Sequence, residues 1–386
     1  MRRRDFIKMV AGIAALWPLA ARAQQPERMR RVGVLLPFDE NDPEGKNRLR
    51  QFRLGMRDLD WIEGRNALIE FWFSGGNLES INRSVAELIK AAPEVIVAFS
   101  TPGLAAVRQA TSTIPIVFVI VSNPVGQGFV PSLAHPGGNI TGFSFMEPEI
   151  VGKWINLLSE LKPGLSRATL MFNPDTAPFH DSSYRSLAAA PRPSIEFEVA
   201  HVRTADEIES TITKLGNEQG SGLILGSDNF LANRRETILK LANEHRVPTI
   251  SPFRQFAVDG SLVVYGPDTG DISRRASAYV DRILRGERPG NLPVQSPTRF
   301  ELVVNLKTAK ALGLSVRESF LELRRGDRIG SRFAALRMSA FGTKRTWTRR
   351  VRHVPFSAPK CFTSPRLDDA KASGCRFPGV SLRAAT

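Results

Sequence analysis

The chain has 386 residues and a formal charge of +15, a balance that by itself would favour a nucleic-acid binder. Its terminal segments, residues 1–23 and 317–386, hold 21 of the 53 Lys and Arg but only 6 of the 38 Asp and Glu. Residues 24–316 therefore contain 32 basic and 32 acidic residues. The neutral body excludes a basic stripe for nucleic acid, and because it contains no cysteine it also excludes a thiolate metal site, a disulfide framework and a cysteine nucleophile.

Residues 1–23 contain the parts of an export signal in the correct order. A basic start, Arg2 to Arg4, precedes an apolar stretch at 9–19 that is too short to span a membrane, and residues 21–23 form an A-x-A cleavage pattern. The run from Arg3 to Lys8 also resembles the twin-arginine export signal. We therefore expect an exported, soluble, periplasmic protein whose signal peptide is removed after Ala23.

The first half of the body alternates apolar runs with amphipathic ones. The apolar runs predict buried strands at 31–37, 67–73, 95–99 and 114–119, and the amphipathic runs between them predict helices. Such an alternation is typical of a doubly wound α/β domain with a parallel sheet.

The second half repeats this pattern, with strands predicted at 167–172, 194–199, 222–226 and 247–250. We therefore predict an α/β protein with two similar doubly wound lobes, whose parallel sheets are joined by a multi-strand hinge. One large sheet is the alternative, but single cores rarely exceed about 250–300 residues.

Three elements follow once the second lobe is complete: a helix at 271–285, a strand at 299–305 and a short helix at 307–312. We place them back on the first lobe, so that lobe 1 is 30–143 plus 268–316 and lobe 2 is 144–267. The chain then crosses between the lobes more than once, which suits a hinge that closes around a ligand.

Residues 317–386 lose the hydrophobic periodicity and are rich in arginine, serine and proline. Such a composition buries too little apolar surface to offset the entropy of ordering. We expect a basic tail outside the fold, either disordered or the product of read-through.

The strand at 95–99 leads directly into Ser100 and Thr101, with Pro102 suited to the first turn of a helix. In open α/β sheets ligands bind at the carboxyl ends of strands, and a helix N-terminus favours an anionic group. The stretch predicts a ligand site, and an ordinary capped helix is the alternative.

Motifs for catalysis and cofactors are missing from the sequence. There is no G-x-S-x-G nucleophile elbow and no phosphate loop, and the four histidines of the body lack metal-ligand spacing. We expect no catalytic residue, no metal and no cofactor.

Several motifs in order carry a resemblance to a known family: Ser-Thr-Pro-Gly at 100–103, Ser-Asn-Pro-Val-Gly at 122–126, Pro-Gly-Gly-Asn-Ile-Thr-Gly-Phe at 136–143, and Phe-Glu-Leu-Val-Val-Asn at 300–305. Over about residues 30–316 the chain resembles the periplasmic substrate-binding proteins of ABC transporters, in particular relatives of the tryptophan- and tyrosine-binding proteins. The resemblance implies the type I periplasmic binding protein fold, no catalytic activity and a ligand in the interlobe cleft. Asn123 stands where the family pattern has aspartate, and the tail after 316 is a second departure.

We predict that the protein captures a small molecule, such as an amino acid or related compound, and delivers it to an ABC permease in the inner membrane. We expect a monomer that binds no nucleic acid. A periplasmic sensor for a membrane receptor or kinase is the alternative, and an exported α/β hydrolase is less favoured because no activated nucleophile is visible. The candidate ligand-binding residues follow predicted strand ends, except the aromatic Tyr265, and each has a cap or turn role as its alternative: Phe38, Ser100, Thr101, Asn123, Asn173, Ser227, Asp228 and Tyr265.

Overall fold

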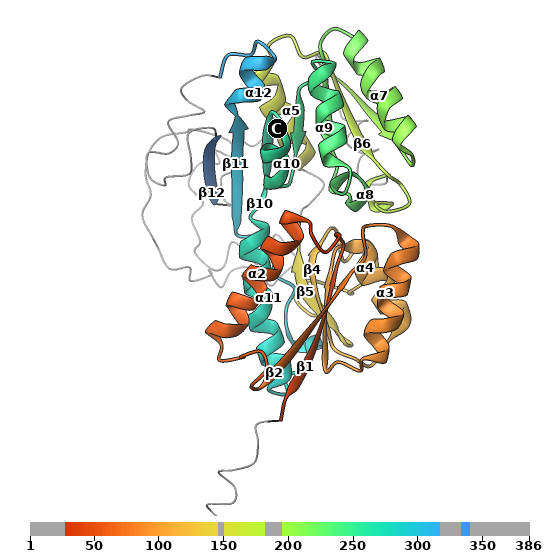
Figure 1. Cartoon of the computed structure of the whole chain (residues 1–386), viewed down its shortest axis with the longest axis vertical. Helices are drawn as coiled ribbons and strands as arrows, with labels where there is room; N and C mark the ends of the chain where they lie inside the picture. Colours follow the sequence, from red (N-terminus) through yellow and green to blue (C-terminus); the bar gives the residue numbers. More distant parts are fainter. Residues whose placement is uncertain (1–27, 146–149, 182–194, 317–332, 340–386) are drawn as a thin grey trace, which may run out of the picture. The chain divides into compact units, whose positions relative to one another are not determined.

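The computed structural model describes residues 28–145, 150–181, 195–316 and 333–339 (Figure 1). The predicted signal peptide, residues 1–23, lies outside these ranges, as do residues 317–332 and 340–386 of the predicted tail. None of the helices within the described ranges has the length and apolar composition that a membrane crossing requires.

The first lobe is built on one parallel sheet with the strand order β2-β1-β3-β4-β5. Helices α2 and α11 cover one face of this sheet, and α3 and α4 cover the other (Figure 1). The strands are β1 (Arg30–Leu36), β2 (Ala67–Phe73), β3 (Val95–Phe99), β4 (Ile116–Val121) and β5 (Ile140–Ser144), and the helices are α2 (Pro43–Asp58), α3 (Leu78–Lys90), α4 (Thr101–Ala110) and α11 (Thr269–Leu284).

The second lobe repeats the first. Its strands β7-β6-β8-β9-β10 are parallel and follow the same spatial order as β2-β1-β3-β4-β5. This confirms the prediction of two similar doubly wound lobes. The strands are β6 (Arg167–Phe172), β7 (Glu196–His201), β8 (Ser221–Leu225), β9 (Thr249–Ser251) and β10 (Val263–Pro267), and the helices are α5 (Ile150–Leu161), α7 (Ala205–Asn217), α8 (Asn229–Ala232), α9 (Arg235–Glu244) and α10 (Arg254–Asp259).

The last strand and helix of the body lie on a different lobe from the one expected. Strand β11 (Arg299–Asn305) pairs antiparallel with β10, and α12 (Leu306–Ala311) follows it, so the prediction that 299–312 return to the first lobe is wrong. All five residues of β10 are buried, and β11 covers an edge of this strand that would otherwise carry unpaired backbone groups. A strand pattern in the sequence does not specify which sheet the strand joins.

One segment of the predicted tail also joins the second sheet. Strand β12 (Phe333–Ser339) pairs antiparallel with β11 over the whole length of both strands. The expectation that nothing after residue 316 belongs to the fold is therefore wrong for 333–339. Phe333–Ser339 contains no β-branched residue and no strict alternation of apolar and polar residues, which is why the sequence did not indicate it.

Several segments connect the two lobes. The chain leaves the second lobe between β10 and α11, and it returns between the short 3₁₀ helix η1 (Pro289–Asn291) and β11. The last residues of β5 lie beside this returning segment, where Ser144 donates its N–H to the carbonyl of Gln295 at 2.9 Å. The chain first passes from the first lobe to the second between β5 and α5. Parallel connections of this kind form a hinge between the lobes.

Two sets of contacts hold helix α2, which borders the interlobe space. The Asp42 carboxylate accepts the N–H groups of Glu44 at 2.8 Å and Gly45 at 3.0 Å, so α2 begins with a satisfied cap. On its other side α2 packs along α11, where the Ser277 hydroxyl donates to the carbonyl of Phe52 at 2.9 Å. The cap thus fixes the start of α2, and the contact with α11 holds α2 against the body of the first lobe.

Candidate ligand-binding site between the lobes

A small pocket of about 20 Å³ lies between the carboxyl ends of the two sets of strands. First-lobe residues from α2, the β3–α4 turn and β4 line one side of it, and second-lobe residues after β6, β8 and β9 line the other. The lining residues are Arg48, Ser100, Thr101, Pro102, Ile120, Thr176, Phe179, Ser227, Asn229 and Phe253. Its position matches the edge of the sheets at which α/β proteins bind ligands.

Two lining residues of the first lobe have strained backbones. Ser100 has φ 73° and ψ 159°, a region that essentially only glycine occupies, and Ile120 has φ 60° although it is β-branched. Ile120 is the extra residue where the β4–β5 register shifts between Val119 and Val121. Strain of this kind clusters at functional sites, which indicates that this turn contacts a ligand.

The hydroxyls of Ser100 and Thr101 each accept one hydrogen bond from the backbone. Ser100 Oγ accepts the N–H of Gly103 at 3.4 Å, and Thr101 Oγ1 accepts the N–H of Ser122 at 3.3 Å. Neither hydroxyl donates to another group in the described part of the chain. Because a hydroxyl can accept and donate together, both protons remain available to a ligand.

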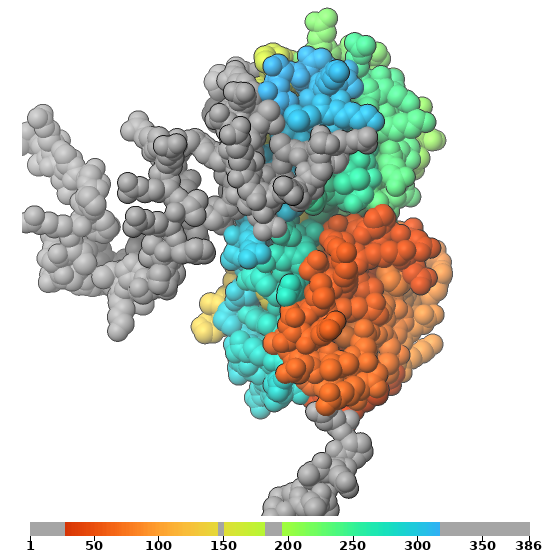
Figure 2. All heavy atoms as spheres, turned by 60° about the vertical axis from the view of Figure 1, so that its left-hand side comes forward, coloured from red at the N-terminus to blue at the C-terminus, as the bar shows by residue number. Residues whose placement is uncertain are grey.

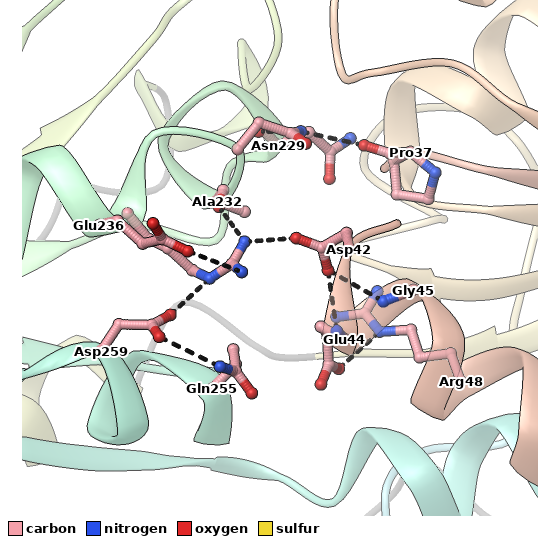
Figure 3. Close-up of polar contacts among 12 residues, drawn as sticks. Pro37, Asp42, Glu44, Gly45, Arg48, Asn229, Ala232, Glu236, Gln255 and Asp259 are labelled. Atoms are coloured by element: carbon pink, nitrogen blue, oxygen red, sulfur yellow. Dashed lines mark hydrogen bonds and ion pairs between the residues drawn. The ribbon is translucent and has the colours of Figure 1, made fainter. Parts of the chain in front are cut away.

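Arg48 is the one charged residue among the lining residues and is only 2% exposed. Its guanidinium lies 4.8 Å from the ring centre of Phe38 in the first lobe and 5.3 Å from that of Phe253 in the second. Its Nε donates to the Glu44 carboxylate at 2.8 Å (Figure 3). The same carboxylate oxygen accepts the hydroxyl of Thr269 at 2.9 Å. The aromatic rings thus stack on the guanidinium while Glu44 binds one of its edges.

On the second-lobe side, His180 supports the lining residue Ser227. The Nε2 of His180 lies 3.1 Å from the carbonyl oxygen of Ser227, and burial lowers the pKa of His180 from 6.5 to about 3. The imidazole is therefore neutral at physiological pH and donates from Nε2 to this carbonyl. This contact helps to fix the turn after β8.

Asp228, next to Ser227, is also buried, and burial raises its pKa from 3.8 to about 6, although four hydrogen bonds favour the ionised form. One carboxylate oxygen accepts the N–H of Asn173 at 2.8 Å, and the other accepts the Thr176 hydroxyl and the N–H of Phe230. The N–H of Leu231 supplies the fourth bond. Both oxygens are thus used to join the turns after β6 and β8.

The structure brings three of the eight predicted residues into the pocket lining, namely Ser100, Thr101 and Ser227. Phe38 packs against the guanidinium of Arg48 behind the lining. Asn173 and Asp228 lie next to lining residues and bond to the chain. Whether any of these side chains binds a ligand stays a prediction.

The other two predicted residues have local roles outside the lining. Asn123 adopts φ 44°, and its side-chain oxygen accepts the N–H of Gly126 at 2.9 Å, which is the turn role held as its alternative. The Tyr265 hydroxyl accepts from Lys153 at 2.7 Å, and its ring stacks on Phe300 at 5.8 Å. Their ligand contacts also remain predictions.

The sequence reasoning missed Arg48, although a signal was present. The buried positions of α2 recur with helical spacing, and Glu44 and Arg48 occupy this stripe together with Phe52. A charged i, i+4 pair on the apolar face of a helix indicates charges that are buried and therefore need partners, because burying an unpaired charge is costly. Asn229 was missed more narrowly, because it directly follows the predicted Ser227 and Asp228.

A second arginine joins the lobes beside the pocket. Arg235, at the start of α9, bonds to Asp42 of the first lobe at 2.7 Å, to Asp259 at 2.6 Å and to the carbonyl of Ala232 at 2.9 Å (Figure 3). Asn233 adds a hydrogen bond to the carbonyl of Pro37 at 3.0 Å. In Figure 2 the red-orange atoms of the first lobe meet the green and teal atoms of the second directly.

Two doubly wound lobes with several connections and a pocket between them define a periplasmic binding protein fold of type I. A conserved domain protein from Vibrio cholerae has this fold, with 25% identity and a TM-score of 0.67 over 76% of this chain and 97% of that one. The ABC domain from Streptococcus pneumonia in complex with L-Trp shares the fold at 20% identity, with a TM-score of 0.66 over 75% of this chain and 97% of that one.

Sequence comparisons specify the family. The model described as ABC transporter substrate binding protein matches residues 43–325. The tyrosine-binding protein of Clostridioides difficile (strain R20291) is 25% identical over 263 residues, which make up 68% of this chain and 75% of that protein. The chain belongs to the ABC transporter substrate-binding protein family.

Proposed function

We propose that this protein is the periplasmic solute-binding component of an ABC transporter. It captures a small molecule that carries a carboxylate, such as an amino acid or related compound, and delivers it to a permease in the inner membrane. The observation that carries the proposal is the pocket between the carboxyl ends of both sets of strands, lined by Arg48 and by the hydroxyls of Ser100 and Thr101. The tyrosine-binding relative supports an amino acid or a similar compound as the ligand.

Capture and release follow from the hinge. In the open form the ligand meets the strained β3–α4 turn of the first lobe, where hydroxyl protons are available. Closure then brings Ser227 and Asn229 of the second lobe to the ligand and excludes water from its polar groups. Each hydrogen bond between the ligand and a lobe is stronger in this closed, partly dry pocket than in open solvent.

Export supports the same role. The basic start, short apolar stretch and A-x-A pattern of residues 1–23 would send the protein to the periplasm, where family members meet their ligands before delivery. The body between the termini has balanced charge, which suits a protein that binds a small solute and not a nucleic acid, and we propose that it acts as a monomer.

Native mass spectrometry of freshly purified protein tests the proposal, because a tightly bound solute co-purifies. We expect a small carboxylate-bearing molecule that dissociates on unfolding. Small-angle scattering then measures closure, since a hinged protein becomes more compact when the identified ligand is added to ligand-free protein. An unchanged radius of gyration at saturation, or a bound molecule without a carboxylate, would contradict the proposed role.

A further inference from the structure

We propose that Arg48 binds the carboxylate of the ligand and that the pocket requires no α-ammonium group. The protein would then accept carboxylic acids that lack the amino group, alongside or in preference to amino acids. This inference rests on the proposed function, because it assigns the chemical class of ligand for the same pocket.

The guanidinium of Arg48 is held in one orientation with one edge open. The rings of Phe38 and Phe253 stack on it at 4.8 Å and 5.3 Å, and Glu44 binds only the Nε. No hydrogen bond or ion pair joins its two Nη groups to another residue in the described ranges. A planar guanidinium with a free edge is suited to a carboxylate that accepts two parallel hydrogen bonds.

The rest of the first-lobe lining supports an anion at this position. Ser100 and Thr101 line the same pocket as Arg48, and their hydroxyl protons are not used within the described chain. They begin the ten-residue helix α4, whose N-terminus carries a partial positive charge. The donors on this side therefore converge on a negatively charged group.

The described lining offers no negative charge to an ammonium group. The ten lining residues include no aspartate or glutamate. Two carboxylates lie just behind them: the charge of Glu44 is already neutralised by Arg48, and both oxygens of Asp228 are bound by the chain. The carbonyl of Ser227 is bound by His180.

The electrostatics of the donors supports the same conclusion. Arg48 and Glu44 form a neutral pair, and the hydroxyls of Ser100 and Thr101 and the N-terminus of α4 supply the further positive potential that stabilises a ligand carboxylate. An ammonium group in the closed pocket would lose water without gaining a counter-charge, which is costly. Removing this group from the ligand should therefore weaken binding little or strengthen it.

The first test uses the unaltered protein and three probes with the same phenol ring: L-tyrosine, 3-(4-hydroxyphenyl)propanoate and tyramine. Calorimetry should give the propanoate an affinity equal to or above that of L-tyrosine, while tyramine binds about 10- to 150-fold more weakly than the propanoate. Binding of L-tyrosine with a propanoate at least tenfold weaker would overturn the inference and leave the proposed function intact. If none of the three binds and native mass spectrometry finds a ligand without a carboxylate, the proposed function itself fails.

The second test asks whether Arg48 recognises the carboxylate directly. The double variant Arg48→Met with Glu44→Gln avoids a buried unpaired carboxylate, and Arg50→Lys, an exposed change on the same helix, is the control. The readout is the affinity ratio between 3-(4-hydroxyphenyl)propanoate and its amide, which differ only in the carboxylate. The ratio should fall about 10- to 150-fold in the double variant and stay unchanged in the control. A ratio that stays at the unaltered value in the double variant would mean that Arg48 only supports the pocket, and the inference would fail.

Discussion

Two buried arginines at the boundary between the lobes differ in one respect, the number of partners that the chain gives them. Arg235, 5% exposed, bonds to two carboxylates and a backbone carbonyl. Arg48, 2% exposed, bonds to the described residues through Nε alone and lines the pocket with its other edge. Because a buried charge is costly without partners, the saturated arginine indicates a structural contact and the unsaturated one indicates a place for a ligand.

The two arginines are also linked through α2. Asp42 caps this helix with one carboxylate oxygen and binds Arg235 with the other, and Arg48 lies further along the same helix. Arg235 therefore helps to position the helix that presents Arg48. Removing each arginine in turn, and measuring stability and affinity on the same variants, tests this difference in role.

The largest effect is expected from Arg235→Met. This change leaves the buried carboxylates of Asp42 and Asp259 without their guanidinium, and breaking a buried ion pair typically costs about 3–5 kcal/mol. Urea denaturation should show this loss in the free energy of unfolding. Lys240→Met, an exposed change on the same helix α9, is the control and should cost less than about 1 kcal/mol. A similar small loss in both variants would mean that the contact contributes little.

Arg48→Lys should have the opposite profile, with affinity affected more than stability. Lysine keeps the positive charge and most of the side-chain volume but loses the planar fork that can donate two parallel hydrogen bonds. The affinity for a carboxylate ligand should fall by about 10-fold or more, equal to a loss of about 1.5–3 kcal/mol for a hydrogen bond to a charged group. Calorimetry and urea denaturation on the same preparation check this, and a loss of stability without a loss of affinity would contradict it.

The hydroxyls of the β3–α4 turn give the next smaller effect. If Thr101 or Ser100 donates to the ligand, Thr101→Ala and Ser100→Ala should each lower affinity by up to about 10-fold. If the hydroxyls only cap the helix, the change should appear mainly as about 0.5–2 kcal/mol of stability. Unchanged affinity beside lowered stability in both variants would assign these residues a structural role.

The smallest net effect in the unaltered protein is expected for pH, because two dependences oppose each other on the second-lobe side of the pocket. The pKa of His180 is lowered to about 3, so its contribution to stability is present above pH 6.5 and is lost as the pH falls towards 3. The pKa of Asp228 is raised to about 6, so its contribution is present below pH 3.8 and is lost as the pH rises through 6. The two dependences oppose each other between about pH 4 and pH 6.

Asp228→Asn removes one of these dependences and keeps the other. The melting temperature of this variant should fall more steeply than that of the unaltered protein when the pH is lowered from 6 to 4, because only His180 then contributes. His180→Gln should give the reverse, with relative stability rising on acidification. Parallel melting profiles for all three proteins across this interval would show that neither residue titrates as described.

The sequence by itself determined the two lobes, most of their strands and part of the pocket. Continuous apolar runs such as β3 and β8 are buried on both faces, and the residues that follow them, Ser100 and Ser227, necessarily lie at the carboxyl edge of a parallel sheet. These features depend on neighbouring residues in the chain, and for that reason they can be predicted from local patterns.

The tertiary structure alone decided which distant groups meet. It placed β11 on the second lobe, left Asn123 and Tyr265 outside the pocket lining, and brought Arg48 between aromatic rings of both lobes. Asp42 and Arg235 are separated by 193 residues and yet form one ion pair. Strand pairing and charge pairing over such separations depend on how the two lobes pack, and no local pattern in the sequence records that packing.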